Sequence, residues 1–328
     1  MQKLLAWLQL CRFAAVFTAM ADICLGYLLT HEAFEPARDF GLLLASSSCL
    51  YLAGMVFNDV FDREIDSRER PKRPIPSGRV SLRGAVAFGA ILVGIGLLCS
   101  LIAGTGSAII AGLLTACIFL YDGAVKSTVA GPVAMGACRF LNVMLGASLS
   151  PLPATAGAAW TSVWALPQLH VAAGLGIYIA GVTWFARHEA GTSRPTQLAA
   201  AAGTINLGIA ILVGFVLNWP EAADRRVRAA LALGLVAVIV NRRLLAALLD
   251  PVPAKVQAAV RAMLLSLIML DAVIVFSVRE NNTCAIAVAL LLVPATLLSR
   301  FLPCRVVPQA SESPCSHVES AVPDASRG

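Results

Sequence analysis

Residues 58–74 read Asn58-Asp59-Val60-Phe61-Asp62-Arg63-Glu64-Ile65-Asp66-Ser67-Arg68-Glu69-Arg70-Pro71-Lys72-Arg73-Pro74 and form the densest run of charge in a chain with only 13% charged residues. The run follows directly on an apolar segment of helix length, Phe40 to Phe57. If that helix continues for two more turns, Asn58, Asp62 and Asp66 lie on one face, with Asp59 one position round. Pro71 and Pro74 then end the helix, because proline has no backbone N–H to donate.

Three or four oxygen ligands on one helix face indicate a site for a hard divalent cation. Mg²⁺ takes oxygen ligands and commonly reaches a protein through one or two carboxylates together with substrate phosphates. Lys72 and Arg73 add fixed positive charge beside the carboxylates. The stretch therefore predicts a diphosphate site. The alternative is a solvated loop whose Lys and Arg residues only set the membrane topology, but such a loop does not need carboxylates in helical register.

The composition predicts a polytopic membrane protein. Of the 328 residues, 58% are hydrophobic and the mean hydropathy is +0.79, so the chain carries more apolar surface than one soluble core can hide. The net charge of +6 falls mostly in loops, without a basic patch interleaved with aromatic residues, and we expect no nucleic-acid partner. The nine cysteines are scattered without a C-x-x-C pair, which favours neither disulfides nor a zinc site.

Apolar segments of about 17 to 23 residues, the length needed to cross a bilayer, predict an all-α bundle of nine or ten transmembrane helices. We interpret the first segment as a spanning helix and not as a cleaved signal peptide, because no small-residue cleavage site follows it. The segments lie near residues 7–29, 40–57, 82–103, 106–121, 130–149, 166–186, 198–217, 228–248, 257–278 and 283–302.

Lys and Arg residues accumulate in alternate loops, which face the cytoplasm by the positive-inside rule. The basic segment 221–228 falls in a loop predicted on the opposite side and disagrees with this topology. We predict an integral multi-pass protein of the bacterial inner membrane or an equivalent membrane, with its active site facing the cytoplasm. Residues 1–303 form the transmembrane domain in this interpretation. Residues 304–328 are rich in Ser, Pro, Glu and Ala, which predicts a disordered cytosolic tail.

Four charged residues lie within or near apolar segments, where charge is costly: Arg12, Asp22, Arg139 and Asp271. For Arg12 and Arg139, snorkelling of the side chain towards the membrane surface is an alternative to a functional role. Arg139 and Asn142 lie one turn apart on one face of the fifth segment. Asp22 and Asp271 lie deeper, and we assign neither a role.

Two further polar clusters end segments on the same predicted side of the membrane. Tyr121 and Lys126 follow the fourth segment, and a cation there suits a diphosphate leaving group. Arg187, His188 and Glu189 close the sixth segment. Glu189 is a candidate ligand for a second metal ion, and Arg187 is a candidate contact to phosphate.

The order of these pieces resembles that of the UbiA superfamily of intramembrane prenyltransferases. Asn58-Asp59-x-x-Asp62-x-x-x-Asp66 followed by Arg70-Pro-Lys-Arg73-Pro-Ile-Pro-Ser-Gly is similar to the family's first signature, without a gap. The resemblance covers roughly residues 5–303 and implies a helical bundle around a central cavity, with a polar cap that holds diphosphate through Mg²⁺. It also implies that Asp59, Asp62 and Asp66 bind the metal–diphosphate with help from Asn58, and that phosphate is contacted by Arg12, Lys72, Arg73 and Lys126.

The chain departs from the family pattern in two places. The family's Tyr-Pro-x-x-Lys loop becomes Tyr121-Asp-Gly-Ala-Val-Lys126, which is one residue longer and lacks the proline. The second acidic motif, which has two or three carboxylates in the family, is reduced to Glu189 beside Arg187 and His188. The pattern around these residues resembles a divergent subgroup, the EboC-like proteins.

From the residues and the resemblance we predict Mg²⁺-dependent transfer of a prenyl group from an allylic prenyl diphosphate to a small aromatic or lipid-like acceptor within the membrane. A membrane-bound terpene cyclase of the same fold and a non-catalytic carrier of a polyprenyl-phosphate lipid remain alternatives, and we expect no obligate protein partner. The predicted catalytic residues are Asp62, Asp66, Lys126 and Glu189. The predicted diphosphate contacts are Arg12, Asn58, Lys72, Arg73, Tyr121, Arg139, Asn142 and Arg187, and the predicted metal ligands are Asn58, Asp59, Asp62, Asp66 and Glu189.

Overall fold

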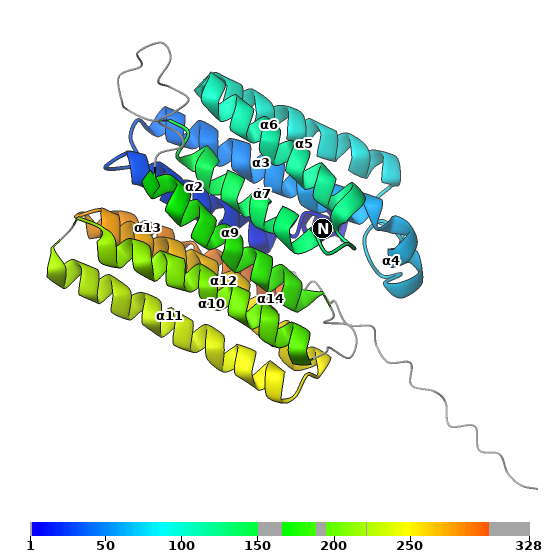
Figure 1. Cartoon of the computed structure of the whole chain (residues 1–328). Coiled ribbons are helices and arrows are strands. Elements are labelled where there is room, and N and C mark those ends of the chain that lie inside the picture. Colours follow the sequence, from blue (N-terminus) through cyan, green and yellow to red (C-terminus); the bar gives the residue numbers. More distant parts are fainter. Residues whose placement is uncertain (1, 150–165, 188–194, 221, 302–328) are drawn as a thin grey trace, which may run out of the picture.

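The computed structural model describes residues 2–149, 166–187, 195–220 and 222–301, and within these ranges every regular element is a helix (Figure 1). The predicted tail, residues 304–328, lies outside the described residues. The elements are α1 Gln2–Leu10, η1 Phe13–Ala15, α2 Val16–Thr30, α3 Ala37–Phe61, α4 Arg63–Glu69, α5 Leu82–Ala103, α6 Thr105–Leu120, η2 Tyr121–Val125, α7 Gly131–Gly146, α9 Leu166–Ala186, α10 Pro195–Asn218, α11 Ala223–Leu249, α12 Pro253–Val278, α13 Asn282–Leu290 and α14 Leu292–Phe301.

Nine helical segments in the described ranges are long and apolar enough to cross a membrane. The helix α7, with 16 residues, is a shorter member of the same bundle and packs between α6 and α9. The prediction of an all-α bundle of nine or ten helices is confirmed, and the chain is an integral multi-pass membrane protein. The last of the nine segments, Asn282–Arg300, consists of α13 and most of α14.

The bundle has an inner and an outer set of helices. The helices α2, α9 and α12 are the most buried, and α2 contacts α3, α7 and α12. By contrast α5, α6 and α11 expose large apolar side chains, because their outer faces meet lipid tails and not water. Examples are Ile91, Ile95, Leu98, Leu113, Leu231 and Leu235.

The backbones of α2 and α7 meet at two glycines. A Cβ on Gly26 would collide with the carbonyl oxygen of Val143 and lie 2.9 Å from the backbone nitrogen of Ala147. A Cβ on Gly146 would lie 2.6 Å from the carbonyl oxygen of Ile23. Small residues allow such close approach in membranes, where helix association depends on packing. This contact sets α2 directly against α7.

The first apolar segment is not one helix, which corrects the prediction of a single span over residues 7–29. The helix α1 ends at Leu10, and Arg12 adopts a left-handed conformation with φ 45° before η1 and α2 begin. The spanning part is Phe13–Thr30. The left-handed residue turns the chain between α1 and α2 and places Arg12 at the end of α2 that adjoins the end of α3.

The charged run 58–74 continues α3, as predicted, with one interruption. The helix α3 ends at Phe61, Asp62 separates it from α4, and the backbone N–H of Asp66 still bonds to the carbonyl of Asp62 at 2.8 Å. The helix α4 ends at Glu69, shortly before Pro71. In Figure 1, α4 projects from one end of the bundle.

Two arginines of the basic segment 221–228, which disagreed with the predicted topology, make contacts within the bundle. Arg225 donates from Nη1 to the carbonyl oxygens of Phe276 at 2.6 Å and Arg279 at 2.5 Å, where α12 ends. Its Nη2 donates to the carbonyl of Glu280 at 2.8 Å. Arg228 pairs with Asp224 one turn earlier. Arg225 therefore stabilises the end of α12, which is a role unrelated to the topology signal, whereas the pair of Arg228 is exposed.

Candidate functional site

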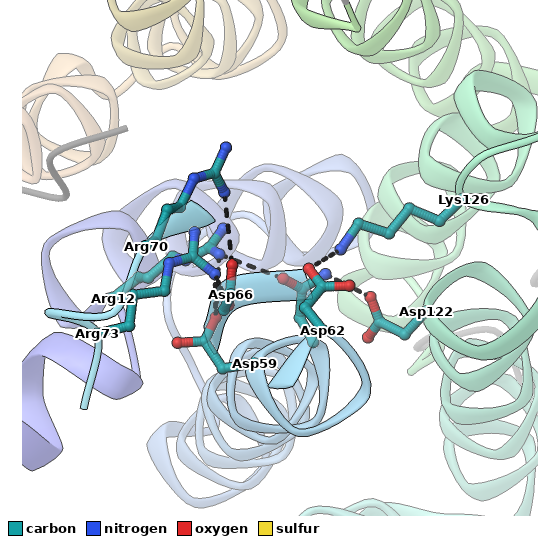
Figure 2. Close-up of polar contacts among 9 residues, drawn as sticks. Arg12, Asp59, Asp62, Asp66, Arg70, Arg73, Asp122 and Lys126 are labelled. Atoms are coloured by element: carbon teal, nitrogen blue, oxygen red, sulfur yellow. Dashed lines mark hydrogen bonds and ion pairs between the residues drawn. The ribbon is translucent and has the colours of Figure 1, made fainter. Parts of the chain in front are cut away.

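The acidic motif lies where α3, α4 and η2 meet at one end of the bundle. Asn58, Asp59 and Asp66 are buried, and Asp62 is half-buried. The helical register of α3 and α4 points these side chains inward, while Phe61 and Ile65 on the opposite side are exposed. Figure 2 shows two groups of contacts, one around Asp59 and Asp66 and one around Asp62.

The first group joins Asp59 and Asp66 to guanidinium groups. Arg73 Nη1 lies 2.5 Å from Asp66 Oδ2 and 3.2 Å from Asp59 Oδ1, so it bridges both carboxylates (Figure 2). Arg70 lies 3.8 Å from Asp66. Arg12 Nη2 donates to Asp59 Oδ1 and to Asn58 Oδ1, each at 3.2 Å. Arg12 and Arg73 thus lie beside the acidic motif, as the sequence predicted.

The second group joins the motif to the segment after α6. Lys126 Nζ pairs with Asp62 Oδ2, so the predicted proximity of these two residues is confirmed. Asn58 Nδ2 donates to Asp122 Oδ1 at 2.7 Å (Figure 2). Sequence reasoning missed Asp122 as a site residue. The available signal was the longer loop, in which Asp122 stands where the family has proline.

The extra residue in this loop is accommodated as one turn of π-helix. The segment η2, Tyr121–Val125, has the backbone N–H of Lys126 bonded to the carbonyl of Tyr121 at 3.0 Å, which is an i→i+5 bond. Such turns often occur at functional sites. Here it directs Asp122 towards Asn58 and Lys126 towards Asp62.

A pocket opens beside the acidic motif and extends into the bundle. It contains about 560 Å³ of empty space, part of which is open to the outside of the protein. Tyr121 and Asp122 lie at one end, and Ser47, Arg139 and Asn142 lie at the other. Between them the lining is mostly apolar and includes Met55, Leu114, Ile118 and Met135. The pocket therefore extends from Asp122, which bonds to Asn58 of the acidic motif, to a second polar group inside the membrane.

This second group contains two residues predicted to contact diphosphate. Arg139 Nη1 pairs with Asp22 Oδ2 at 2.6 Å, and Asn142 Nδ2 donates to the same oxygen at 2.8 Å. Asn142 accepts from Ser47 Oγ at 2.6 Å. The rise of α3 between Ser47 and Asn58 is about 16 Å. The structure therefore does not place Asn142 beside the acidic motif, and it engages Arg139 with Asp22.

The other predicted site residues do not all lie at the acidic motif. Lys72 is exposed, and its carbonyl accepts from Arg79 at 2.7 Å. Arg187, at the end of α9, donates to the carbonyl of Thr128, so the ends of the fourth and sixth segments lie together. Glu189 and its neighbour His188 lie outside the described residues.

The donor set at the acidic motif is compatible with Mg²⁺. All candidate ligands offer hard oxygen atoms, and each motif carboxylate faces a cation: Asp59 faces Arg12, Asp62 faces Lys126 and Asp66 faces Arg73. Within the described ranges, no three His, Cys, Asp or Glu side chains lie close enough together to hold a metal ion by themselves. Mg²⁺ does not require such a cage, because it keeps water molecules and shares substrate phosphates.

One cysteine lies close to this charge cluster. Cys11, between α1 and η1, is buried, and burial together with the nearby Asp59 carboxylate raises the pKa of its thiol to about 11. Desolvation and a neighbouring negative charge both disfavour the thiolate. The thiol is therefore protonated at neutral pH and is chemically inert in the folded protein.

The sequence of this chain matches a known protein family. The model of the UbiA prenyltransferase family matches residues 16–239. A digeranylgeranylglyceryl phosphate synthase of Methanocaldococcus jannaschii is 40% identical over 104 residues, which are 31% of this chain and 36% of the relative. The chain spans between about a third and just over half of the length of the curated relatives it matches.

Solved structures agree with the fold. A UbiA homologue from Aeropyrum pernix K1 has a TM-score of 0.65 at 21% identity, covering 79% of this chain and 96% of that one. A UbiA homologue from Archaeoglobus fulgidus bound to GPP and Mg²⁺ has a TM-score of 0.60 at 14% identity, covering 87% of this chain and 99% of that one. At these identities the likeness shows the helical fold alone. The assignment to an EboC-like subgroup stays a prediction.

Proposed function

This chain belongs to the UbiA prenyltransferase family, and from that premise we propose that it transfers a prenyl group from an allylic prenyl diphosphate to a small acceptor bound in the same intramembrane pocket. The observation that carries the proposal is the pairing of Asp59, Asp62 and Asp66 with Arg12, Lys126 and Arg73. This cluster adjoins the pocket through Asp122, which lines the pocket and accepts a hydrogen bond from Asn58. The site thus combines carboxylates that can bind a metal ion, cations that can bind phosphate and an apolar cavity that can hold a prenyl chain.

Known relatives support the choice of diphosphate and metal. The relative from Methanocaldococcus jannaschii is named digeranylgeranylglyceryl phosphate synthase, and the Archaeoglobus fulgidus homologue is bound to GPP and Mg²⁺. In this chain Asn58, Asp59, Asp62 and Asp66 would hold Mg²⁺, and Glu189 is a further candidate. When bound, Mg²⁺ stabilises negative charge on a departing diphosphate.

The basic residues of the site serve the same leaving group. Lys126, Arg12 and Arg73 come from three separate parts of the chain. Arg12 and Arg73 lie on one side of the acidic motif and Lys126 lies on the other (Figure 2). Preorganised cations stabilise charge that develops in the transition state without reorganising at that moment. The apolar walls of the pocket exclude bulk water, which would otherwise capture an allylic cation.

The orientation in the membrane follows from the loops. The site lies at the bundle end that carries the loop after α3, where Arg and Lys residues are concentrated. The positive-inside rule supports a cytoplasmic location for this end, so the diphosphate enters from the cytoplasm. Residues 1–303 form the catalytic domain in this proposal. The acceptor in this proposal is a small aromatic or lipid-like molecule.

Diphosphate release by the purified protein tests the proposal. The protein in nanodiscs is incubated with Mg²⁺ and labelled geranyl, farnesyl or geranylgeranyl diphosphate, with and without a membrane lipid extract as the source of acceptor. We expect labelled lipid product and diphosphate release that is lost in Asp62→Asn and kept in Glu64→Gln, whose side chain is 78% exposed and outside the pocket.

The alternatives give different outcomes. Tight binding of the labelled diphosphate without release contradicts the proposal and favours a carrier. Release accompanied by a cyclic hydrocarbon in place of a labelled conjugate contradicts it and favours a terpene cyclase of the same fold.

A further inference from the structure

A buried polar network lies at the inner end of the pocket. Asp22 Oδ2, on α2, accepts from Arg139 Nη1 at 2.6 Å and from Asn142 Nδ2 at 2.8 Å. Arg139 Nη2 donates to Thr18 Oγ1 at 3.1 Å. Asp271, on α12, lies close enough to Asp22 and Arg139 for its charge to interact with both. Both aspartates are 0% exposed.

The charges in this network do not balance if both aspartates are ionised. Two carboxyl groups face one guanidinium group, and among the residues that the structure describes no donor group reaches Asp22 Oδ1 or either oxygen of Asp271. An unpaired carboxylate inside a protein is strongly disfavoured, and such a group takes up a proton instead. A proton on Asp271 provides an O–H donor for Asp22 Oδ1. One proton therefore neutralises the excess charge and satisfies the unpartnered oxygen of Asp22.

We propose that Asp22, with a protonated Asp271 behind it, holds Arg139 as a charge-neutral pair and thereby makes the inner end of the pocket a subsite for an uncharged, hydroxyl- or carbonyl-bearing acceptor. This inference rests on the proposed prenyl transfer. It gives Arg139 and Asn142 a different role from the diphosphate contacts predicted from the sequence. Asp22 and Asp271 are positioning residues in it, since neither lines the pocket.

The hydrogen-bonding capacity of the network fits such an acceptor. Both N–H groups of the Asn142 side chain are used, since they donate to Ala19 O at 3.0 Å and to Asp22, and its oxygen accepts one bond from Ser47. Arg139 has five N–H groups, and among the described residues it donates to Asp22 and Thr18. The remaining N–H groups can donate to an oxygen of a ligand in the pocket that Arg139 lines.

An anionic group is poorly matched to the same place. The positive charge of Arg139 is already compensated by Asp22, so the inner end offers hydrogen bonds without net charge. A second anion there would face Asp22 inside a low-dielectric bundle. The other end of the pocket, at Asp122, adjoins the acidic motif and its cations Lys126, Arg12 and Arg73, where the metal–diphosphate would be held. An acceptor held at Arg139 therefore presents its outer end to the prenyl group.

The protonation of Asp271 is tested without measuring turnover. Infrared spectra of the wild-type protein in nanodiscs at pH 7 are compared with those of Asp271→Asn. We expect the C=O stretching band of a protonated carboxyl group in the wild type and its loss in the variant. Identical spectra overturn the proposal.

Thermal unfolding gives an independent measure. Asp271→Asn keeps a neutral donor beside Asp22, so its midpoint should equal that of the wild type. Asp22→Asn should unfold at a lower temperature, and the double variant, in which Arg139 has no carboxylate, at the lowest. If Asp271→Asn is destabilised as much as Asp22→Asn, Asp271 is ionised and the proposal fails.

The specificity of the subsite is tested with two probes that differ by one non-hydrogen atom, the uncharged 4-hydroxybenzyl alcohol and the anionic 4-hydroxybenzoate. The neutral probe should raise the unfolding midpoint of the wild type, and Arg139→Gln should weaken its binding about tenfold. Stabilisation by the anionic probe instead, or by neither, overturns the subsite. Because none of these measurements needs a prenyl diphosphate, their failure is distinguishable from the failure of the proposed prenyl transfer.

Discussion

Replacing Arg73 by glutamine should lower the stability of the protein more than replacing Lys126, the cation on the other side of the acidic motif. Arg73 contacts two carboxylates whose side chains are 2% and 7% exposed, those of Asp66 and Asp59. Without it, Asp59 keeps Arg12, but Asp66 keeps only Arg70 at 3.8 Å, which is beyond hydrogen-bonding distance. Breaking a buried ion pair by removing one partner costs about 3–5 kcal/mol. Arg73 is itself 18% exposed, and glutamine can still donate one bond, so we expect a loss of about 2–3 kcal/mol.

Lys126→Gln should behave differently. The pair with Asp62 is 32% and 21% exposed, and ion pairs nearer the surface contribute about 0–1 kcal/mol. The predicted loss is therefore in prenyl transfer, of about tenfold or more, because one cation on the leaving group is missing. Arg63→Gln is the control, since Arg63 pairs with an exposed glutamate.

The assay is thermal unfolding in detergent micelles, followed by tryptophan fluorescence, together with diphosphate release at saturating Mg²⁺. We expect Arg73→Gln to unfold at the lowest temperature, with Lys126→Gln and Arg63→Gln close to the wild type. The reasoning is refuted if Arg73→Gln unfolds like Arg63→Gln, or if Lys126→Gln is the least stable of the three.

Three further predictions follow from contacts elsewhere in the chain. Gly26→Ala should lower the unfolding midpoint strongly, because its Cβ would collide with the backbone of α7, whereas Gly94→Ala, with open space around the new methyl group, should leave it unchanged. Arg225→Gln should lose about 2 kcal/mol of unfolding free energy, because charged hydrogen bonds to three carbonyl groups disappear, while Arg228→Gln, in an exposed pair, should not. Cys11 should resist maleimide at pH 8, because about one part in a thousand of a thiol with a pKa of about 11 is thiolate at that pH. It should react fully once the protein is unfolded. Rapid labelling of Cys11 in the folded protein would contradict its burial.

Local composition was enough to predict most of the fold. The predicted segments 82–103 and 166–186 coincide with α5 and α9, because a change from apolar to polar residues marks the end of a span. The acidic motif was recognisable for a similar reason, since its carboxylates repeat with the period of a helix. The alternation of loops predicted that Lys126 lies on the same side of the membrane as Asp62, and the two residues form a pair.

Pairings between distant residues were not predictable in this way. Asp22 and Arg139 meet because α2 packs on α7, and Asn58 and Asp122 meet because a π-helical turn rotates the end of α6. Hydropathy does not specify which faces of neighbouring helices meet. The left-handed conformation of Arg12 is likewise invisible in an apolar run, yet it decides where the first spanning helix begins.

The close contact of α2 and α7 also has a consequence for assembly after insertion into the membrane. Helices in a bilayer gain little from apolar contact with one another, since lipid tails are equally apolar. The glycine contact at Gly26 and the ion pair between Asp22 and Arg139 lie one turn apart along α2. If α2 slid along α7 by one turn, Asp22 would lose its cation and a residue with a side chain would replace Gly26 at the crossing. The two features together thus define one register for this helix pair and select against the neighbouring ones while the bundle forms.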